Sequence, residues 1–572
     1  MTEVALGVLA SGPAAEAVTR HVPRLVAEGF ASKLFAKDPT LWGPGAEPES
    51  AIRLAWVSLG RTSRPLVGEV AALRDHLAEQ GVDHVVLCGM GGSSLAPEVI
   101  CATAGVELTV LDSSNPDQVR TALGDRLDRA VVVVSSKSGS TVETDSQRRA
   151  FEGAFSRAGI DPKERIVIVT DPGSPLDSNA RAAGYRVINA DPLVGGRYSA
   201  LTAFGLVPSG LAGVDLEQLL DEAESVADLL ADDDEANPAL RLGAAFAGTD
   251  PLRDKLVLVD ERSWATGFAD WAEQLIAEST GKNGTGVLPV VVQGHPESAD
   301  PEVRSPGADV TVARLVDDVA DDDLAQEGAG ADDADMPFHT AVDPSRSEVQ
   351  VSGSLGAQLL LWEVATAVAG RILGINPFDQ PDVESAKNAA RGLLEATEAL
   401  PDHIAFSDGA IEVRALGGDW LGDAKTVADA LDSLISQLDP LHGYLAIMAY
   451  LDRLADDFLS GARRTLAVRT GRPTTFGWGP RFLHSTGQYH KGGPATGVYL
   501  QITTTPHADL AIPGRDFTFG DFIGAQAGGD AQILADHGRP VLKLHLSDHD
   551  TGLDQLTRAL GLTAASPVKE SR

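Results

Sequence analysis

The sequence predicts an α/β protein built on two doubly wound parallel sheets, with helical segments at the N-terminus and inserted between the sheet-forming parts. Short apolar, β-branched runs alternate with helical stretches through most of the chain, and this rhythm is typical of parallel strands joined by crossover helices. The length of 572 residues exceeds the roughly 100–200 residues usual for one domain. Several of the strand-like runs end in turns rich in glycine and hydroxyl residues, as ligand sites of such sheets do.

The first α/β unit contains five strand-like runs separated by helical stretches such as "LAPEVICATA" and "TDSQRRAFEGAFSRAG". We predict strands at 84–90, 106–112, 130–136, 165–171 and 185–190. Four successive valines in "AVVVVSS" indicate a strand that is buried on both faces. We therefore assign residues 76–212 to a first domain, preceded by a mostly helical segment over residues 1–75.

A second α/β unit begins at "DKLVLVDE", residues 254–261, and continues through a strand and a long apolar helix at 348–374. The tail adds strands at 496–503 and 539–546 with a helix from about residue 520 between them. The domain boundaries that we predict are 213–395 for the first part of this second domain, 296–345 for an acidic insertion within it, 396–470 for a helical insertion and 471–572 for the remainder.

Composition narrows the classes of function. The net charge of −36 disfavours binding to nucleic acid, because phosphates would be repelled and no basic patch stands out. Two cysteines, Cys88 and Cys101, do not supply a disulfide framework or a zinc site. The N-terminus lacks the basic residues of a signal peptide, and no run approaches a membrane span. We expect a cytoplasmic protein that contacts neither membranes nor nucleic acid and uses no cofactor or metal.

The segment "VVVVSSKSGSTVET", residues 131–144, is the first candidate site. Ligands of parallel sheets bind beyond the carboxyl ends of the strands, where the next helix presents its N–H groups. Hydroxyls of Ser136, Ser138 and Thr141 at that place match the acceptors of a phosphate monoester. The alternative is a loop that only caps the following helix, with Ser140 and Glu143 forming a capping box.

The segment "GMGGSSLAPE", residues 89–98, is a second glycine-rich strand end. It lacks the third glycine of a dinucleotide fingerprint, although Asp112 stands near the usual acidic position, and it lacks the Gly-Lys-Ser/Thr of a Walker loop. Together with residues 136–141 it would place two glycine- and hydroxyl-rich turns at neighbouring strand ends. That combination favours a small phosphorylated ligand over a dinucleotide.

Three further segments carry candidate side chains. Arg197 in "GGRYS" would suit an anionic ligand or a developing oxyanion, unless it is a surface arginine in a turn. Glu278 in "AESTGKNGTG" would suit a general base, although a solvated helix end is the commoner case. The segment "FDQPDVESAK" brings Gln380, Glu384 and Lys387 to a predicted helix start that, alone, is typical of a capped surface helix.

Taken together, these segments resemble the glucose-6-phosphate isomerase family, whose members consist of two sugar-isomerase domains. "SKSGSTVET" resembles the family's phosphate loop, and "GMGGSSL" its glycine-serine turn. "GGRYSALTAFGL" and "INPFDQPDVESAK" are similar to its two signatures, and "AESTGK" to the turn of its catalytic glutamate. The resemblance covers residues from about 80 to 390.

The resemblance implies a role for each matching residue. The catalytic residues would be Glu278 as the base that moves a proton between C2 and C1, Arg197 beside the enediolate, and Lys387 in ring opening. Glu143 would orient the ring-opening histidine, and Gln380 would line the site. The residues that would bind the phosphate are Gly92, Ser93, Ser136, Lys137 through its backbone, Ser138 and Thr141.

The histidine departs from the family order. In the family it lies between the glutamate and the lysine, where this chain has only His295 and His339, in unlike contexts. Past the lysine, "FLHSTGQYHKGG" is similar to the family's histidine segment, and it gives His484 the ring-opening role. The second domain therefore resembles a permuted one, an arrangement similar to the isomerase half of actinobacterial transaldolase and glucose-6-phosphate isomerase fusions.

The resemblance implies an aldose-ketose isomerase that interconverts glucose 6-phosphate and fructose 6-phosphate in glycolysis and gluconeogenesis, without a cofactor. Two alternatives remain open at this point: a mannose-6-phosphate or dual-specificity isomerase, and a non-catalytic sugar-phosphate sensor. A homodimer is expected because the family shares its sites across a two-fold axis. The apolar helix at 356–373 gives a second reason, since it needs cover.

Overall fold

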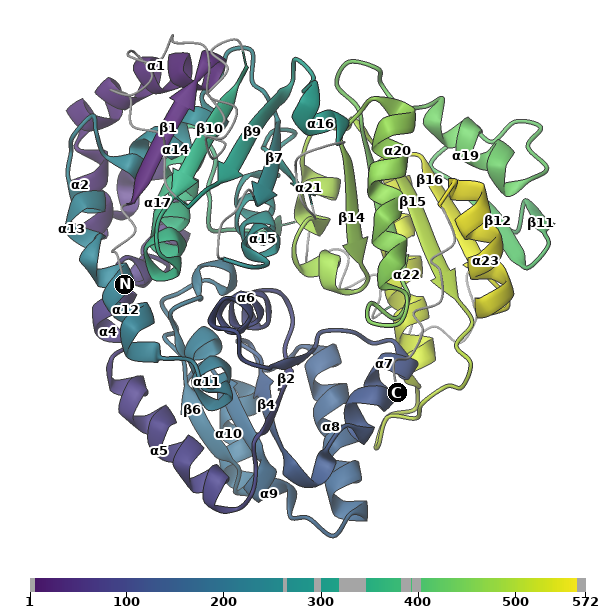
Figure 1. Cartoon of the computed structure of the whole chain (residues 1–572), viewed down its shortest axis with the longest axis horizontal. Helices are drawn as coiled ribbons and strands as arrows, with labels where there is room; N and C mark the ends of the chain where they lie inside the picture. The colour runs from purple at the N-terminus through teal and green to yellow at the C-terminus, as the bar shows by residue number, and fades with distance from the viewer. Residues whose placement is uncertain are drawn as a thin grey trace, which may run out of the picture.

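The computed structural model describes residues 6–260, 265–292, 300–317, 346–381, 392 and 403–562. It contains three β-sheets, each covered by helices, and the three sheets mark three lobes that surround a common centre (Figure 1). The first lobe lies at the bottom of that view, the second at the upper left and the third at the upper right.

The first lobe has a five-stranded, wholly parallel sheet in the order β3-β2-β4-β5-β6. Its strands are β2 (His84–Cys88), β3 (Thr109–Leu111), β4 (Ala130–Ser135), β5 (Ile166–Thr170) and β6 (Arg186–Asn189). Its helices include α6 (Leu95–Ala104), α7 (Pro116–Gly124), α8 (Val142–Arg157), α10 (Pro175–Ala183) and α11 (Ala203–Ala212). The predicted doubly wound sheet is confirmed, because all five runs of β-branched residues form strands within the predicted ranges.

The second lobe has the sheet β1-β10-β9-β7-β8, parallel except for β1, which pairs antiparallel with β10. The strands are β1 (Gly7–Ser11), β7 (Lys255–Asp260), β8 (Leu288–Val292), β9 (Val310–Leu315) and β10 (Glu348–Ser352). The main helices are α1 (Gly12–Glu28), α12 (Leu216–Ser225), α14 (Pro238–Ala247), α15 (Phe268–Thr280) and α17 (Leu355–Leu373). The helix α5 (Pro65–Glu79) packs on α11 of the first lobe.

The third lobe has six strands in the order β11-β12-β16-β15-β13-β14. The strands are β11 (Phe406–Asp408), β12 (Ile411–Leu416), β13 (Tyr444–Tyr450), β14 (Thr474–Trp478), β15 (Gly497–Thr504) and β16 (Val541–Leu546). The last four are parallel, whereas β11 and β12 add antiparallel edge strands. The helices are α19 (Val427–Ile435), α20 (Ala462–Thr470), α21 (Gly487–Gly492), α22 (Phe519–Asp536) and α23 (His549–Leu560).

The third sheet corrects two sequence-based expectations. Residues 471–572 do not complete the second sheet, and the described part of 396–470 is not a helical insertion, because both supply strands to one new sheet. The run "YLAIMAY" of β13 is fully buried and lies between β15 and β14 in that sheet. A short apolar run of this kind is equally compatible with a buried helix, and only its pairing with β14 and β15 decides the matter.

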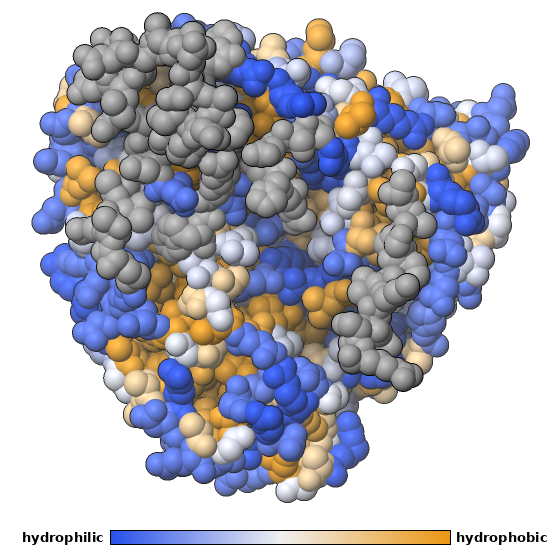
Figure 2. Space-filling model, in the orientation of Figure 1, coloured by the Kyte–Doolittle hydropathy of each residue, from blue (hydrophilic) through white to orange (hydrophobic). Residues whose placement is uncertain are grey.

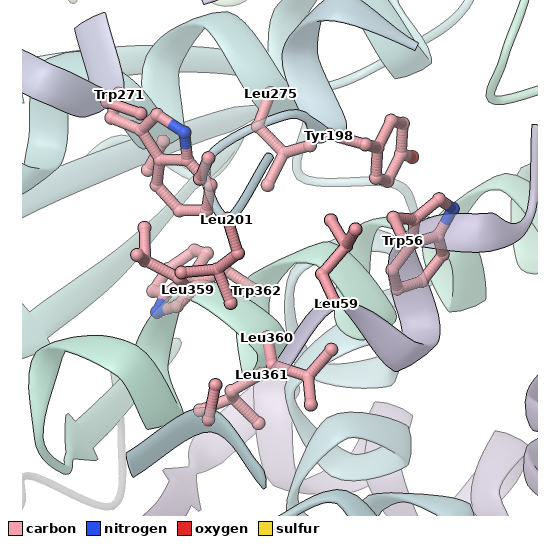
Figure 3. Close-up of a cluster of buried hydrophobic side chains, with 14 of the residues drawn as sticks. Trp56, Leu59, Tyr198, Leu201, Trp271, Leu275, Leu359, Leu360, Leu361 and Trp362 are labelled. Carbon is pink, nitrogen blue, oxygen red and sulfur yellow. The ribbon is translucent and has the colours of Figure 1, made fainter. Parts of the chain in front are cut away.

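The largest hydrophobic core joins the first two lobes (Figure 3). Trp362 of α17 is fully buried and stacks on Phe246 of α14 with ring centroids 6.3 Å apart. Residues 355–370 of α17 are all buried, chiefly against α14, α12 and α15. The apolar helix that was expected to need a partner subunit is therefore covered within the chain, so it is not a reason for a dimer.

The lobes are also packed against one another. One hydrophobic cluster joins the second and third sheets, for example through Val259, Met448 and Tyr489. Another joins α8 to the loop before α22, where Phe151 and Ile512 are members of one cluster. Hydrophobic residues form separate patches among hydrophilic ones on the face shown in Figure 2. Among the helices that the structure describes, none is long and apolar enough to cross a membrane.

Candidate functional site

The turn after β2 lies where the three lobes meet. Gly91 has a φ of +55°, and a Cβ there would lie 2.7 Å from Nε2 of Gln274 and 2.9 Å from the carbonyl oxygen of His484. These two residues belong to α15 of the second lobe and to the segment after β14 of the third. Only glycine meets both the positive φ and the close approach. Gly92 packs on the backbone of Gly196, and the neighbouring Ser93 is buried.

The candidate phosphate loop follows β4 and leads into α8. Ser136 Oγ donates to Thr141 Oγ1 at 3.1 Å, and the hydroxyls of Ser138 and Ser140 lie 2.8 Å apart. Gly139 has a φ of +68°, and a Cβ there would lie 2.6 Å from the side chain of Leu176, which explains glycine at this position. The loop therefore presents hydroxyls at the N-terminus of a 16-residue helix, a place that favours anions.

The capping-box alternative for this loop is wrong. The N-cap of α8 is Thr141, and its side chain makes no capping hydrogen bond. The carboxylate of Glu143 instead faces the third lobe, where it accepts from Nε2 of Gln526 at 2.7 Å. Lys137 forms an ion pair with Asp171, so its ammonium group is already paired within the protein.

Arg197 and Glu278 lie side by side and are both buried. Arg197 Nη1 lies 3.4 Å from Oε2 of Glu278, while its Nε donates to Oγ of Ser279 at 2.8 Å. Its Nη2 donates to the carbonyl oxygens of Pro377 and Asp379 at 2.7 and 3.0 Å. The guanidinium is thus held rigidly beside the Glu278 carboxylate by these contacts.

Gln380 reaches the same place, since its Oε1 accepts from Nη1 of Arg197 at 3.1 Å. The segment before it is held by Lys282, whose Nζ donates to the carbonyl oxygens of Asn376 and Asp379 at 2.8 and 2.6 Å. Burial and the nearby Arg197 lower the pKa of Lys282 to about 8. Glu384 and Lys387, which follow in the chain, lie outside the described residues, as do His295 and His339.

His484 lies at the end of the turn Arg481–His484, directly after β14. Its Nε2 lies 3.2 Å from Oε1 of Glu143, and its side chain is 14% exposed. Gln274 links this histidine to the glutamate of α15, because Nε2 of Gln274 lies 2.7 Å from the His484 carbonyl and 3.5 Å from Oε1 of Glu278. The structure therefore brings His484 to Glu143 and to the neighbourhood of Glu278 within one chain.

Two arginines of the third lobe enter a carboxylate cluster of the first. Arg481 lies 2.6 Å from Oδ2 of Asp112 and 2.5 Å from Oε2 of Glu98. Arg453 lies 3.0 Å from Oε1 of Glu98 and 3.3 Å from Oδ1 of Asp112. Asp112, which in a dinucleotide-binding domain would contact a ribose, is thus a partner of arginines here. These pairs hold the turn that carries His484 against the first lobe.

Two acidic residues of α15 border this cluster. Oε1 of Glu273 accepts from Oγ of Ser485 at 3.1 Å. Burial, together with the nearby negative charge of Asp270, raises the pKa of Glu273 to about 8. Burial also raises the pKa of Asp270, although Arg481 partly opposes that shift. The two arginines are neutralised by Glu98 and Asp112, so further negative charge is disfavoured at this junction.

The structure thus gathers most of the predicted residues around one place, and it adds three that sequence reasoning missed. Gln274 precedes Glu278 by one helical turn, and this i, i+4 spacing signals a shared helix face. Gln526 is a glutamine within the small, apolar run "IGAQAGG" of α22, which marks a buried amide. Lys282 stands in the quoted motif "AESTGK" itself, and only the structure shows which carbonyls it contacts.

We predict that Arg481→Met lowers the free energy of unfolding by about 3–5 kcal/mol, because the buried Asp112 and the half-buried Glu98 lose a partner. Arg469→Met is the matched control. Arg469 pairs with the exposed Asp432 on the surface of the third lobe, and such pairs contribute about 0–1 kcal/mol. Urea unfolding of both variants measures the difference. Equal losses in the two variants would mean that the junction contributes no more than a surface pair.

We also predict a pH-dependent effect of Glu273→Gln. The folded protein binds the Glu273 proton up to a pKa of about 8, whereas the unfolded chain releases it near 4.5. This group therefore lowers stability as pH rises through that interval. The free energy of unfolding of the variant minus that of the parent should therefore be larger at about pH 8.5 than at about pH 5. Urea unfolding at the two pH values tests this, and a difference that does not change with pH contradicts it. The exposed Glu164→Gln serves as control.

The sequence is similar to those of proteins that are named as sugar-phosphate isomerases. The chain is 31% identical over 351 residues to the protein named "Probable glucose-6-phosphate isomerase" from Haloarcula marismortui, covering 55% of this chain and 79% of that protein. It is 28% identical over 390 residues to "Glucose-6-phosphate isomerase" from Rippkaea orientalis, covering 61% of this chain and 73% of that protein. No protein-family model matches the sequence.

A similar solved structure is that of a hypothetical protein from Thermus thermophilus, with a TM-score of 0.54 and 25% sequence identity. The alignment covers 68% of this chain and all of that protein. On the identity to the Haloarcula protein and the share of it that is matched, the chain belongs to the glucose-6-phosphate isomerase family.

Proposed function

We propose that the protein is a glucose-6-phosphate isomerase, which interconverts glucose 6-phosphate and fructose 6-phosphate through an enediolate. The observation that carries this proposal is the meeting of Glu278 and Arg197 with the Glu143–His484 pair, linked through Gln274. Isomerisation of a cyclic sugar needs two separate acid–base functions, one at the ring oxygen and one at the reacting carbons. We assign the first function to His484 with Glu143, and the second to Glu278 with Arg197.

Ring opening is the first step that we assign. His484 would transfer a proton between the ring oxygen and the anomeric hydroxyl, and Lys387 is proposed to assist it. Oε1 of Glu143 lies 3.2 Å from Nε2 of His484. Glu143 would therefore orient the imidazole of His484 and stabilise the imidazolium that forms in the reaction, as a carboxylate partner does in other acid–base sites. Nε2 of Gln526 donates to the same carboxylate oxygen, Oε1 of Glu143, at 2.7 Å and so helps to hold it.

Proton transfer between C2 and C1 is the second step. Glu278 would take the proton from one carbon and return it to the other, which requires one carboxylate within hydrogen-bond reach of both. Arg197 would stabilise the negative charge of the enediolate oxygens, and its contacts to Ser279 and two carbonyls fix it before the reaction starts. Preorganisation of this kind contributes about 2.7–4 kcal/mol per donor in comparable oxyanion sites.

The phosphate is the handle that places the sugar. Its oxygens would be bound by the hydroxyls of Ser136, Ser138 and Thr141 and by the N–H groups at the start of α8. On the side of the neighbouring strand end, the phosphate would contact Gly92 and Ser93. Gln380 would line the sugar side of the pocket. A homodimer and a cytoplasmic location complete the proposal. The family resemblance supports the homodimer, and two free, buried cysteines fit a reducing compartment.

We predict that Glu278→Gln folds as the parent does and still binds fructose 6-phosphate, but that its turnover falls by about 10²–10⁴-fold. The amide keeps the shape of the side chain and loses its basicity. A coupled assay measures turnover, and calorimetry measures binding of the sugar phosphate. The exposed Glu164→Gln is the matched control and should retain full activity. Turnover within about tenfold of the parent would remove Glu278 from the role of base.

For His484→Ala we expect turnover of the cyclic sugar phosphate to fall by about 10²-fold or more. Proton exchange on an open-chain analogue should change little, because that reaction needs no ring opening. His403→Ala, an exposed histidine of the third lobe, should alter neither rate. Solvent-deuterium exchange followed by NMR measures the open-chain reaction. If both reactions fell equally in His484→Ala, the histidine would act in the proton transfer itself or in folding.

A further inference from the structure

A cluster of two histidines and an aspartate lies away from the isomerase site, at the carboxyl ends of β15 and β16. His507 follows β15, and His549 and Asp550 begin α23. Oδ1 of Asp550 lies 2.9 Å from Nδ1 of His549 and 3.5 Å from Nε2 of His507. The imidazole ring centroids are 5.0 Å apart. One ligand atom from each side chain thus lies within 4.8 Å of the other two.

The other nitrogen of each imidazole faces a further carboxylate. Nε2 of His549 lies 3.1 Å from Oδ2 of Asp456, whose side chain is 3% exposed. Nδ1 of His507 lies 3.7 Å from Oδ2 of Asp117 on α7 of the first lobe. Metal-binding histidines in proteins characteristically direct their second nitrogen to a carboxylate in this way, which fixes the ring and raises its basicity as a ligand.

We propose that His507, His549 and Asp550 form a binding site for a divalent transition metal of the zinc class. Ligand bonds of about 2.0–2.2 Å in a tetrahedron place ligand atoms roughly 3.3–3.6 Å from one another. The separations of 2.9 and 3.5 Å from Asp550 Oδ1 come near these values, and the two imidazole nitrogens lie within 4.8 Å of each other. Two imidazoles select a transition metal over Mg²⁺ or Ca²⁺, which prefer oxygen ligands. A water molecule would fill the fourth position.

The position of the cluster indicates what the metal would do. His507 lies near the start of the loop between β15 and α22. This loop lies on the first lobe, where Nη2 of Arg120 donates to the Ala508 carbonyl at 2.7 Å. Ile512 of the same loop enters the hydrophobic cluster of α8. A metal at His507 would tie this loop to α23 and so stabilise the docking of the third lobe on the first. The ion is a structural ligand in this proposal, with no part in the isomerase reaction.

A proton competes with the metal for the same place. Asp456 and Asp550 raise the pKa of His549 to about 9, with the hydrogen bond to Asp456 as the largest cause. The alternative occupant is therefore an imidazolium held between two carboxylates. The two interpretations differ in what they require of His507. A protonated His549 needs only Asp456 and Asp550, whereas the metal also needs His507 as a ligand.

The test uses the full-length, tag-free protein after chelator treatment, titrated at about pH 8 with Zn²⁺ and, separately, with Co²⁺. We expect one ion per chain, a Co²⁺ absorption spectrum typical of tetrahedral coordination, and a rise in Tm on Zn²⁺ addition. His507→Ala should abolish the Co²⁺ spectrum. Asp456→Asn should weaken binding by about 10–100-fold. His403→Ala is the matched control.

Two results would overturn the proposal: no saturable binding up to about millimolar Zn²⁺, or binding that His507→Ala leaves unchanged. The cluster and all of these variants lie outside the isomerase site. The metal-free parent and the variants are therefore expected to retain isomerase activity. Metal binding and isomerase function can therefore fail independently. Circular dichroism of each variant distinguishes loss of the site from loss of the fold.

Discussion

The ion pairs of Arg481 with Asp112 and Glu98 are the constraint on which the candidate site depends. They hold a turn of the third lobe against the first, and that turn ends at His484. His484 and Glu143 are 341 residues apart in the sequence. Tertiary contacts such as these ion pairs are therefore needed to bring the imidazole beside the carboxylate. The contacts of Gln274 with both His484 and Glu278 then bring the second lobe to the same point. Three sheets thus share one site because a cluster of paired charges fixes their junction.

The electrostatics of the molecule explain how an anionic substrate could be bound at all. The chain carries a net charge of −36, and its candidate phosphate loop contains one lysine, whose ammonium pairs with Asp171. The loop must therefore rely on hydroxyls, backbone N–H groups and the start of α8, which are neutral donors. Such donors act only at contact distance, whereas the repulsion between the protein and a free sugar phosphate is long-ranged and is screened by salt.

Sequence patterns predict the parts of this structure that depend on local signals. β4 follows from four valines, and Arg197, Glu278 and Gln380 follow from motifs that are short and contiguous. The third sheet could not be predicted in the same way, because β13 is an apolar run whose identity as a strand depends on pairing with residues far along the chain. The edge strand β1 was missed for the same reason, since it pairs with β10 some 340 residues later in the sequence.

The order of the chain also has a physical consequence. His484 comes from the strand end of a third sheet, about two hundred residues after Glu278, yet it reaches Glu143 without help from another subunit. The described residues of the candidate site therefore come together in one chain once the third lobe has docked, and docking itself depends on buried pairs. Arg463 with Asp300 and Glu302, and Arg472 with Asp309, join the third lobe to the second, as Arg481 joins it to the first. Since breaking a buried pair leaves an uncompensated charge, a partly undocked lobe would be strongly disfavoured. Assembly of the isomerase site and folding of the third lobe should therefore occur together.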